Sequence, residues 1–300
     1  LQATLYEDYW RPMELDFGQE AYGSDFDRFM RHYLTVKTGD IPRIGDVYEA
    51  FKLYARSSKG SEADDTAYVE TLIADMREFT RYFCAMALGA EVDVLLQKAF
   101  RDLRELKVDV AYPFLLTLYR DYVNEVLEKE EFIEIIRLVE SYVFRRAICS
   151  IPTNSLNKTF ANFTKSIDKD HYLESIKAHF LLLPSYRRFP RGEEFRREMQ
   201  VRDLYNFRTR SYWLRRFENH NRKEYVPVDD YTIEHIMPQS TPLGETWQSD
   251  LGEDWEHIHE TWLHTLGNLT LTGYNSELSN RPFREKRDID CLLYTSPSPR

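Results

Sequence analysis

Apolar residues recur at helical spacing through most of the first 220 positions of the chain. Between Thr66 and Ala87, for example, Leu72, Met76 and Phe79 fall three or four residues apart, which places them on one face of an amphipathic helix. The same spacing predicts helices at about 66–87, 92–103, 130–148, 170–183, 193–199 and 204–219. We therefore expect a mainly α protein that begins with a helical array.

The pattern changes at Val226. Two short β-prone runs, Tyr231–Ile233 and Leu269–Thr272, flank a long connection that contains several prolines and glycines. One helix is expected inside this connection, from about Glu253 to Leu266, and a polar, basic helix follows the second run. The order strand, long loop with one helix, strand, helix predicts a small α+β module after the helical array.

Three parts are predicted along the chain. Residues 1–225 form a helical connecting or specificity region, and residues 226–290 form the α+β module. Residues 291–300 (CLLYTSPSPR) lack the charged, helical pattern of the preceding residues and are expected to be a non-native tail. Since the chain opens with Leu1 inside periodic sequence, we also expect that something precedes it.

Composition excludes several classes of protein. The chain is 42% hydrophobic and 30% charged, which is typical of a globular protein. Its longest apolar stretches run to about nine residues, roughly half of what a membrane-spanning helix needs. The three cysteines, Cys84, Cys149 and Cys291, form no CxxC pair, so a disulfide framework and a cysteine-rich zinc finger are both excluded. A cytoplasmic protein without a membrane span is expected.

Charge is unevenly distributed along the chain. The net charge is −10, which by itself argues against a nucleic-acid partner. Residues 186–223, however, hold twelve Lys and Arg against five Asp and Glu, a local charge of +7, whereas residues 226–290 hold four against thirteen, a local charge of −9. The basic segment is either a phosphate-binding surface or a solvated face that the acidic segment neutralises.

Three segments of the α+β module carry the candidate chemistry: DYTIEHIMPQS, LGNLTLTGYN and SELSNRPFREK. In this order they resemble an HNH (His-Me finger, ββα-metal) nuclease motif, in which two strands and a helix hold one divalent metal. The resemblance implies that His235 is the general base, that Asn268 orients it, and that Glu234 and Asn275 help to bind the metal.

The residue types suit these roles. Hydrolysis of a phosphodiester needs a proton acceptor that is neutral near pH 7, and imidazole meets that need. A hard cation takes oxygen ligands, which a carboxylate and an amide provide, so one Mg²⁺ or Mn²⁺ ion is expected. Glu234 and His235 are adjacent, however, and would point to opposite faces of a regular strand. Irregular backbone before Pro238 would have to bring them into one pocket with the two asparagines.

Arginine and lysine side chains are predicted to hold DNA near the site. Arg281, Arg284 and Lys286 lie in the last helix, and Lys286 is the best candidate for a contact near the reacting phosphate. The alternative is that these cations only complement the helix dipole. Arg215 and Arg216, which lie among Tyr and Trp residues in the basic segment, are expected to bind the DNA backbone across the acidic metal site.

A competing metal site would use His257, His259 and His264. On the predicted helix at most two of them converge, and two ligands are too few, so we interpret them as a helix face anchored by Trp255 and Trp262.

Further segments resemble the latter half of GmrSD-type restriction endonucleases: FDRFMRHYLTVKTGDIP, DVAYPFLLTLY and LVESYVFRRAICSIPTNSLNKTF. With the nuclease motif, the resemblance covers nearly all of residues 1–290. It implies a metal-dependent DNA endonuclease of a bacterial anti-phage system, acting on double-stranded and in some relatives modified phage DNA. It also implies a ParB-like nucleotide-hydrolysing module upstream, and we expect this module to be missing from this sequence.

Two readings of function stay open at this point. The chain is either such a nuclease, or a catalytically inactive helical scaffold that binds DNA or protein. Whether it forms a homodimer to cut both strands is also open.

Overall fold

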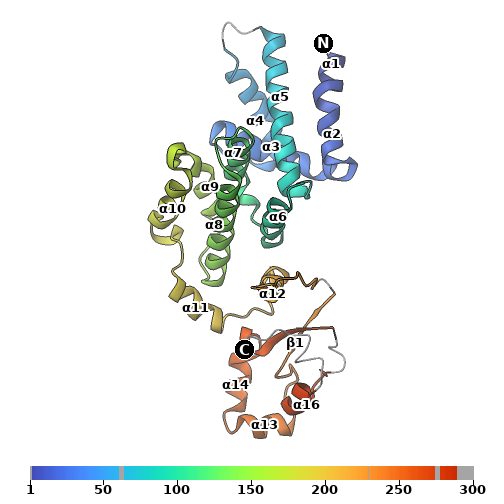
Figure 1. The fold of residues 1–300 in the computed structure, drawn as a ribbon, viewed down its shortest axis with the longest axis vertical. Helices are drawn as coiled ribbons and strands as arrows, with labels where there is room; N and C mark the ends of the chain where they lie inside the picture. The colour runs from blue at the N-terminus through green and yellow to red at the C-terminus, as the bar shows by residue number, and fades with distance from the viewer. Residues whose placement is uncertain (1, 61–63, 229, 274–277, 289–300) are drawn as a thin grey trace. The chain divides into compact units, whose positions relative to one another are not determined.

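The structure is a computed structural model, and it describes residues 2–60, 64–228, 230–273 and 278–288 (Figure 1). The chain divides into two compact units, residues 1–189 and residues 190–300, which are called here the N-terminal unit and the C-terminal unit. The predicted start of a nuclease module at Val226 falls inside the C-terminal unit, and that functional division stays a prediction.

The N-terminal unit is helical throughout its described residues, as the apolar spacing predicts. Its α-helices are α1 (Gln2–Leu5), α2 (Arg11–Phe17), α3 (Gln19–Thr38), α4 (Val47–Ser57), α5 (Asp65–Phe83), α6 (Val94–Leu106), α7 (Tyr112–Val123), α8 (Lys129–Ile148), α9 (Leu156–Phe163) and α10 (Tyr172–Leu182). Two short π-helical stretches, Tyr6–Trp10 and Cys84–Leu88, continue directly into or out of these helices.

Helix α7 is the central element of this unit. It packs against α3, α5, α8 and α9 (Figure 1). Most of its side chains are buried, including Phe114, Leu115, Leu116 and Leu118, each with no exposed surface. A helix whose buried apolar side chains extend around most of its circumference packs inside a bundle, which explains why other helices surround α7.

Local sequence signals set the helix ends in this unit. Asp64 caps α5 by accepting a hydrogen bond from the amide of Ala67 at 3.0 Å. Asp93 caps α6 by accepting from the amides of Leu95 and Leu96 at 2.9 and 3.1 Å. Both carboxylates satisfy amide groups that lack a partner in the first helical turn.

The C-terminal unit contains a small antiparallel sheet with helices before, between and after its strands. In chain order its elements are α11 (Gly192–Val201), α12 (Arg210–Glu218), β1 (Thr232–His235), α13 (Glu245–Leu251), α14 (Trp255–Trp262), a 3-10 turn (Leu266–Asn268), β2 (Leu269–Thr272) and α16 (Phe283–Asp288). In the register of the sheet, Glu234 lies opposite Thr270 and His235 lies opposite Leu269.

The predicted order strand, helical insertion, strand, helix is confirmed, with one correction in the insertion. The helix expected at 253–266 is α14, which ends at Trp262, and an additional helix, α13, precedes it at Glu245–Leu251. Gly252, with φ +80°, lies in the left-handed region and separates the two helices. Met237, Leu243 and Trp247 form a buried apolar cluster, against which Leu251 of α13 and Trp255 of α14 pack.

Candidate active site

His235 ends strand β1, where the pairing with β2 holds the backbone in place. The amide of Ile236, the next residue, donates to the carbonyl oxygen of Asn268 at 2.9 Å, which continues the ladder beyond the strand. The His235 side chain is buried, with 4% of its surface exposed. The candidate base is therefore held by a paired strand end rather than by a free loop.

The imidazole of His235 contacts a second imidazole. Its Nε2 lies 3.1 Å from Nδ1 of His264, which is hydrogen-bonding distance. The ring of Tyr205 stacks on His264, with centroids 5.1 Å apart and planes 12° apart, and meets His235 edge-on at 4.5 Å. The backbone amides of Leu204 and Tyr205 donate to the carbonyl oxygen of His264 at 2.9 and 3.4 Å. The ring pair is therefore fixed by both stacking and backbone hydrogen bonds.

Burial sets the protonation of His235. It lowers the pKa of the imidazole to about 4, and the nearby His264 ring and the Lys286 ammonium shift the pKa in the same direction. The ring is therefore neutral at pH 7 and keeps one nitrogen lone pair that can take a proton.

Glu234 forms a buried ion pair with the last helix. Its Oε1 accepts from Nζ of Lys286 at 2.5 Å, and the same ammonium donates to the carbonyl oxygen of His235 at 2.9 Å. Glu234 is 6% exposed and Lys286 is fully buried. Burial raises the pKa of Glu234 even though Lys286 opposes the shift. This pair attaches α16 to the strand that carries His235.

Asn268 connects the segments that carry the two histidines. Its Oδ1 accepts from the amide of Met237 at 2.6 Å, and its Nδ2 donates to the carbonyl oxygens of Met237 and Leu263 at 3.0 and 2.9 Å. Met237 follows His235 by two residues, and Leu263 directly precedes His264. The Asn268 side chain thus acts on His235 through the backbone. Its three described hydrogen bonds all go to backbone atoms, and none goes to the imidazole of His235.

Glu234, His235 and Asn268 were expected to share one pocket, but in the described residues each side chain contacts a different partner. The Glu234 carboxylate pairs with Lys286, the His235 ring pairs with His264, and the Asn268 amide binds backbone groups. The fourth predicted member, Asn275, lies outside the described residues.

The predicted DNA contacts differ in their exposure. Arg281, Arg284 and Arg216 are exposed to solvent. Arg215 is 7% exposed and Lys286 has no exposed surface, so neither presents its charge to solvent, where DNA would approach. The side chain chosen as the best phosphate contact, Lys286, is instead the inner partner of Glu234.

The described residues do not fit the predicted metal site. A divalent ion on Glu234 would compete with the Lys286 ammonium, which already lies 2.5 Å from the carboxylate. Among the residues that the structure describes, no group of three or more His, Cys, Asp and Glu side chains comes together. The roles of Glu234 and Asn275 as metal ligands therefore stay predictions.

His264 and Tyr205 are the site residues that sequence reasoning missed. His264 was interpreted as part of a helix face, but α14 ends at Trp262 and the His264 ring contacts His235 instead. Its position three residues before Gly267 and four before Asn268, in the segment that leads into the second strand, is the signal that would have found it. Tyr205 carries no comparable signal, because it is one of 20 tyrosines.

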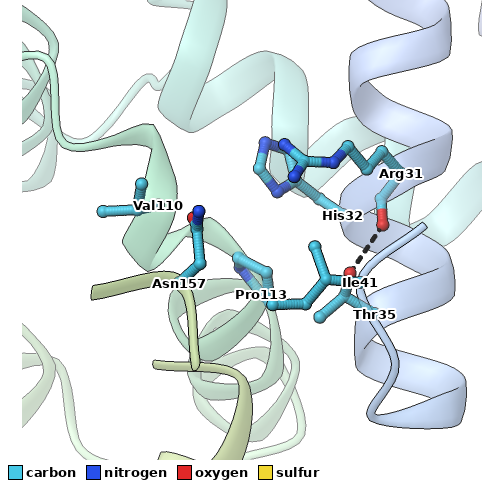
Figure 2. A pocket seen from close by; sticks show the side chains of 7 residues that line it. All are labelled: Arg31, His32, Thr35, Ile41, Val110, Pro113 and Asn157. Carbon is cyan, nitrogen blue, oxygen red and sulfur yellow. Dashed lines mark hydrogen bonds between the residues drawn. The ribbon is translucent and has the colours of Figure 1, made fainter. Parts of the chain in front are cut away.

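A cavity in the N-terminal unit is too small for a substrate. Figure 2 shows Arg31, His32 and Asn157 around it, and its volume is about 10 Å³, roughly that of one water probe. Nε2 of His32 has no hydrogen-bond partner among the described residues, and burial lowers the pKa of this imidazole to about 3. The described helices also include none that is long and apolar enough to cross a membrane.

Comparison with known proteins gives one finding for the C-terminal unit. Residues 189–296 match the family described as GmrSD restriction endonucleases, C-terminal domain. No curated protein and no solved structure gives a significant match. The match confirms the predicted family for this part of the chain, and the likeness of the preceding helices stays a prediction.

Proposed function

We propose, from the membership of residues 189–296 in the family of GmrSD restriction endonuclease C-terminal domains, that this chain hydrolyses phosphodiester bonds of DNA in an anti-phage restriction system. One observation carries the proposal. Inside the matching segment, a neutral imidazole lies buried at the end of β1, beside the antiparallel strand β2 and the helix α16. This is the strand, strand, helix order that the HNH-like motif leads one to expect.

In this proposal His235 is the general base. Its neutral ring takes a proton from the water that attacks the phosphorus atom, while the P–O bond to the leaving oxygen breaks and that oxygen takes a proton from solvent. A pKa of about 4 is low for this task, because a general base works best with a pKa near the working pH. The negative charge of an arriving phosphate would raise it, since an opposite charge nearby favours the protonated ring.

The neighbouring residues hold the base in position. Asn268 fixes the backbone on both sides of the histidine pair, and the ion pair between Glu234 and Lys286 attaches the strand end to α16. Asn268 is thus proposed as a positioning residue that acts through Met237 and Leu263, rather than through a hydrogen bond to the imidazole.

Double-stranded DNA is the proposed substrate, and exposed arginines are its proposed contacts. Arg281 and Arg284 lie just before and within α16, and Arg216 lies in α12. Guanidinium groups at such positions bind phosphates without reading the bases. Modified phage DNA stays a proposal that rests on the family alone.

We also propose that cleavage requires one divalent cation, Mg²⁺ or Mn²⁺. The likeness of the motif to HNH nucleases and the amide oxygen that Asn275 offers support this requirement. The pairing of Glu234 with Lys286 does not support it. No step described above depends on the ion.

A second candidate function is a catalytically inactive scaffold that binds DNA or protein. The observation that favours it is the same ion pair, because it occupies the carboxylate that a metal would need. The two candidates differ in whether the protein cuts DNA.

A plasmid-nicking assay separates these candidates. The wild-type protein is incubated with supercoiled plasmid and Mg²⁺ or Mn²⁺, beside a reaction with EDTA. We expect cleavage by the wild type, and a loss of about 10²- to 10⁴-fold for His235→Ala. His257→Ala is the matched control, because His257 is exposed on α14. Equal cleavage by the wild type and His235→Ala would refute the general base, and no cleavage under any condition would favour the scaffold.

A further inference from the structure

We infer that His264 is the positioning residue of His235, and that it selects which nitrogen of His235 is basic. This inference rests on the proposed function of His235 as a general base. It is carried by the 3.1 Å contact between Nε2 of His235 and Nδ1 of His264, and by the way Tyr205 fixes both rings.

The contact couples the tautomers of the two rings. A neutral imidazole has one N–H and one lone pair, so a hydrogen bond between two neutral rings needs a donor nitrogen on one ring and an acceptor on the other. Because Nε2 of His235 is engaged by His264, Nδ1 is the nitrogen left to meet water. For Nδ1 to accept a proton, Nε2 of His235 must carry the hydrogen and donate it to Nδ1 of His264.

The surroundings of His264 are built to keep its Nδ1 aimed at His235. Tyr205 lies almost parallel to the ring at 12°, which fixes its plane. The amide of Leu204 donates to the His264 carbonyl at 2.9 Å, so the segment that supplies the stacking ring is also tied to the His264 backbone. On the other side, Asn268 binds the carbonyl of Leu263 at 2.9 Å. The ring is therefore held by its face and by the backbone on both sides.

This arrangement gives His264 the role that the sequence suggested for Asn268. The side-chain amide of Asn268 makes its described hydrogen bonds to the backbone of Met237 and Leu263. When His235 takes a proton, its Nε2–H becomes a charged donor, and the bond to the neutral His264 acceptor strengthens. His264 therefore orients the base before the reaction and stabilises the imidazolium after it, without touching the substrate.

Two substitutions at His264 separate the hydrogen bond from the packing. His264→Phe keeps an aromatic ring against Tyr205 but removes the Nδ1 acceptor. His264→Asn restores an acceptor oxygen near the position of Nδ1 and removes the ring. His257→Ala, on the exposed face of α14, is the control that changes a nearby histidine without touching the pair. Circular dichroism melting of each variant shows that it is folded.

The first measurement is made without DNA. Long-range ¹H–¹⁵N NMR of the histidine rings reports which nitrogen of His235 carries the hydrogen. We expect the Nε2–H tautomer in the wild type and in His257→Ala, and a mixture of tautomers in His264→Phe. A wild-type His235 in the Nδ1–H tautomer, or an unchanged tautomer in His264→Phe, would overturn the inference, whether or not the protein cleaves DNA.

The second measurement is single-turnover cleavage of DNA. We expect His264→Phe to lower the cleavage rate at saturating DNA about 10²-fold, because a base held in the wrong orientation loses most of its effect. The DNA concentration at half-saturation should stay within about twofold, and His264→Asn should recover most of the lost rate. Equal rates for His264→Phe and the wild type would overturn the inference. An inactive wild type would instead refute the proposed function, and the NMR result would still decide whether His264 sets the tautomer.

Discussion

The substitution Lys286→Met removes the buried cation of the C-terminal unit while keeping a side chain of similar length. Nζ of Lys286 lies 2.5 Å from Oε1 of Glu234 and 2.9 Å from the carbonyl oxygen of His235. The variant leaves a carboxylate that is 6% exposed without its counter-charge and a strand carbonyl without its donor. It therefore tests whether the pair holds α16 against β1.

The size of the effect follows from the geometry. At 2.5 Å and an effective dielectric constant of about 20, the two charges attract each other by about 6–7 kcal/mol. Desolvation of both groups offsets most of this attraction, so the intact pair contributes little net stability. Removing one partner keeps the desolvation penalty of the other, and we expect Lys286→Met to lower the free energy of unfolding by about 3–5 kcal/mol.

A double variant sharpens the expectation. Glu234→Gln replaces the carboxylate with a neutral amide, which is less costly to bury without an ionic partner. In the Lys286→Met background this second substitution should therefore restore about 1–2 kcal/mol, so that the double variant is more stable than Lys286→Met alone. If the two substitutions acted independently, the double variant would instead be less stable than either Lys286→Met or Glu234→Gln alone.

Urea unfolding followed by tryptophan fluorescence measures these differences where they arise. Four of the five tryptophans lie in the C-terminal unit, and Trp247 contacts Phe283 of α16 at 6.4 Å between ring centroids. Arg287→Met is the control, because Arg287 is the next residue of the same helix and pairs with Asp288 on the exposed surface. No measurable change is expected there. A loss of less than about 1 kcal/mol in Lys286→Met, or additive effects in the double variant, would refute a buried pair.

Three further predictions concern other parts of the molecule. His32 has a pKa near 3 in the folded state and an ordinary pKa of 6.5, so below pH 6.5 the folded protein binds fewer protons than the unfolded chain. The free energy of unfolding should therefore fall as the pH drops below 6.5, by about 2 kcal/mol at pH 5. Thermal melting of His32→Leu should lack this loss, and equal acid sensitivity of both proteins would contradict the prediction. Asn268→Ala should lose about 2–4 kcal/mol in urea unfolding because three buried backbone groups lose their partner, and a loss below about 1 kcal/mol would show that they find another. Arg281 and Arg284 are exposed, and replacing both by Glu should weaken the salt dependence of DNA binding. The slope of the logarithm of the binding constant against the logarithm of the salt concentration should fall in magnitude by about two. An unchanged slope would show that the DNA binds elsewhere.

The sequence predicts the elements of this chain better than the contacts between them. Strand β2 has the predicted bounds, Leu269–Thr272, because Gly267 and Gly273 limit the β-prone run on both sides. Strand β1 extends to His235, two residues beyond the predicted end, because cross-strand pairing with Leu269 continues the ladder. Periodicity reports how a residue lies in its own element, and tertiary pairing decides where that element ends.

The candidate site shows the same limit more sharply. His235 was identified because it lies in a motif, but its partner His264 lies 29 residues away, and helical spacing assigned that residue to a solvated or packed helix face. Lys286 was assigned to DNA because it lies in the basic last helix, where a positive charge near the reacting phosphate would favour binding. Lys286 instead points into the protein because the buried carboxylate of Glu234, 52 residues earlier in β1, is its partner. The pairing of Lys286 with Glu234 has no counterpart in the local sequence, whereas the position of His264 just before Gly267 and Asn268 is a local signal of its role.

The alternation of a strand explains why the site has two separate halves. Adjacent residues of β1 direct their side chains to opposite faces, so Glu234 and His235 meet different neighbours. On one face Glu234 binds Lys286 of α16, and on the other His235 binds His264 and Tyr205. The ammonium nevertheless joins the two halves, because it also binds the carbonyl of His235. In the described residues, therefore, Glu234 contributes to the site by fixing the strand end that carries the proposed base, and His264 contributes by fixing the ring of His235 itself.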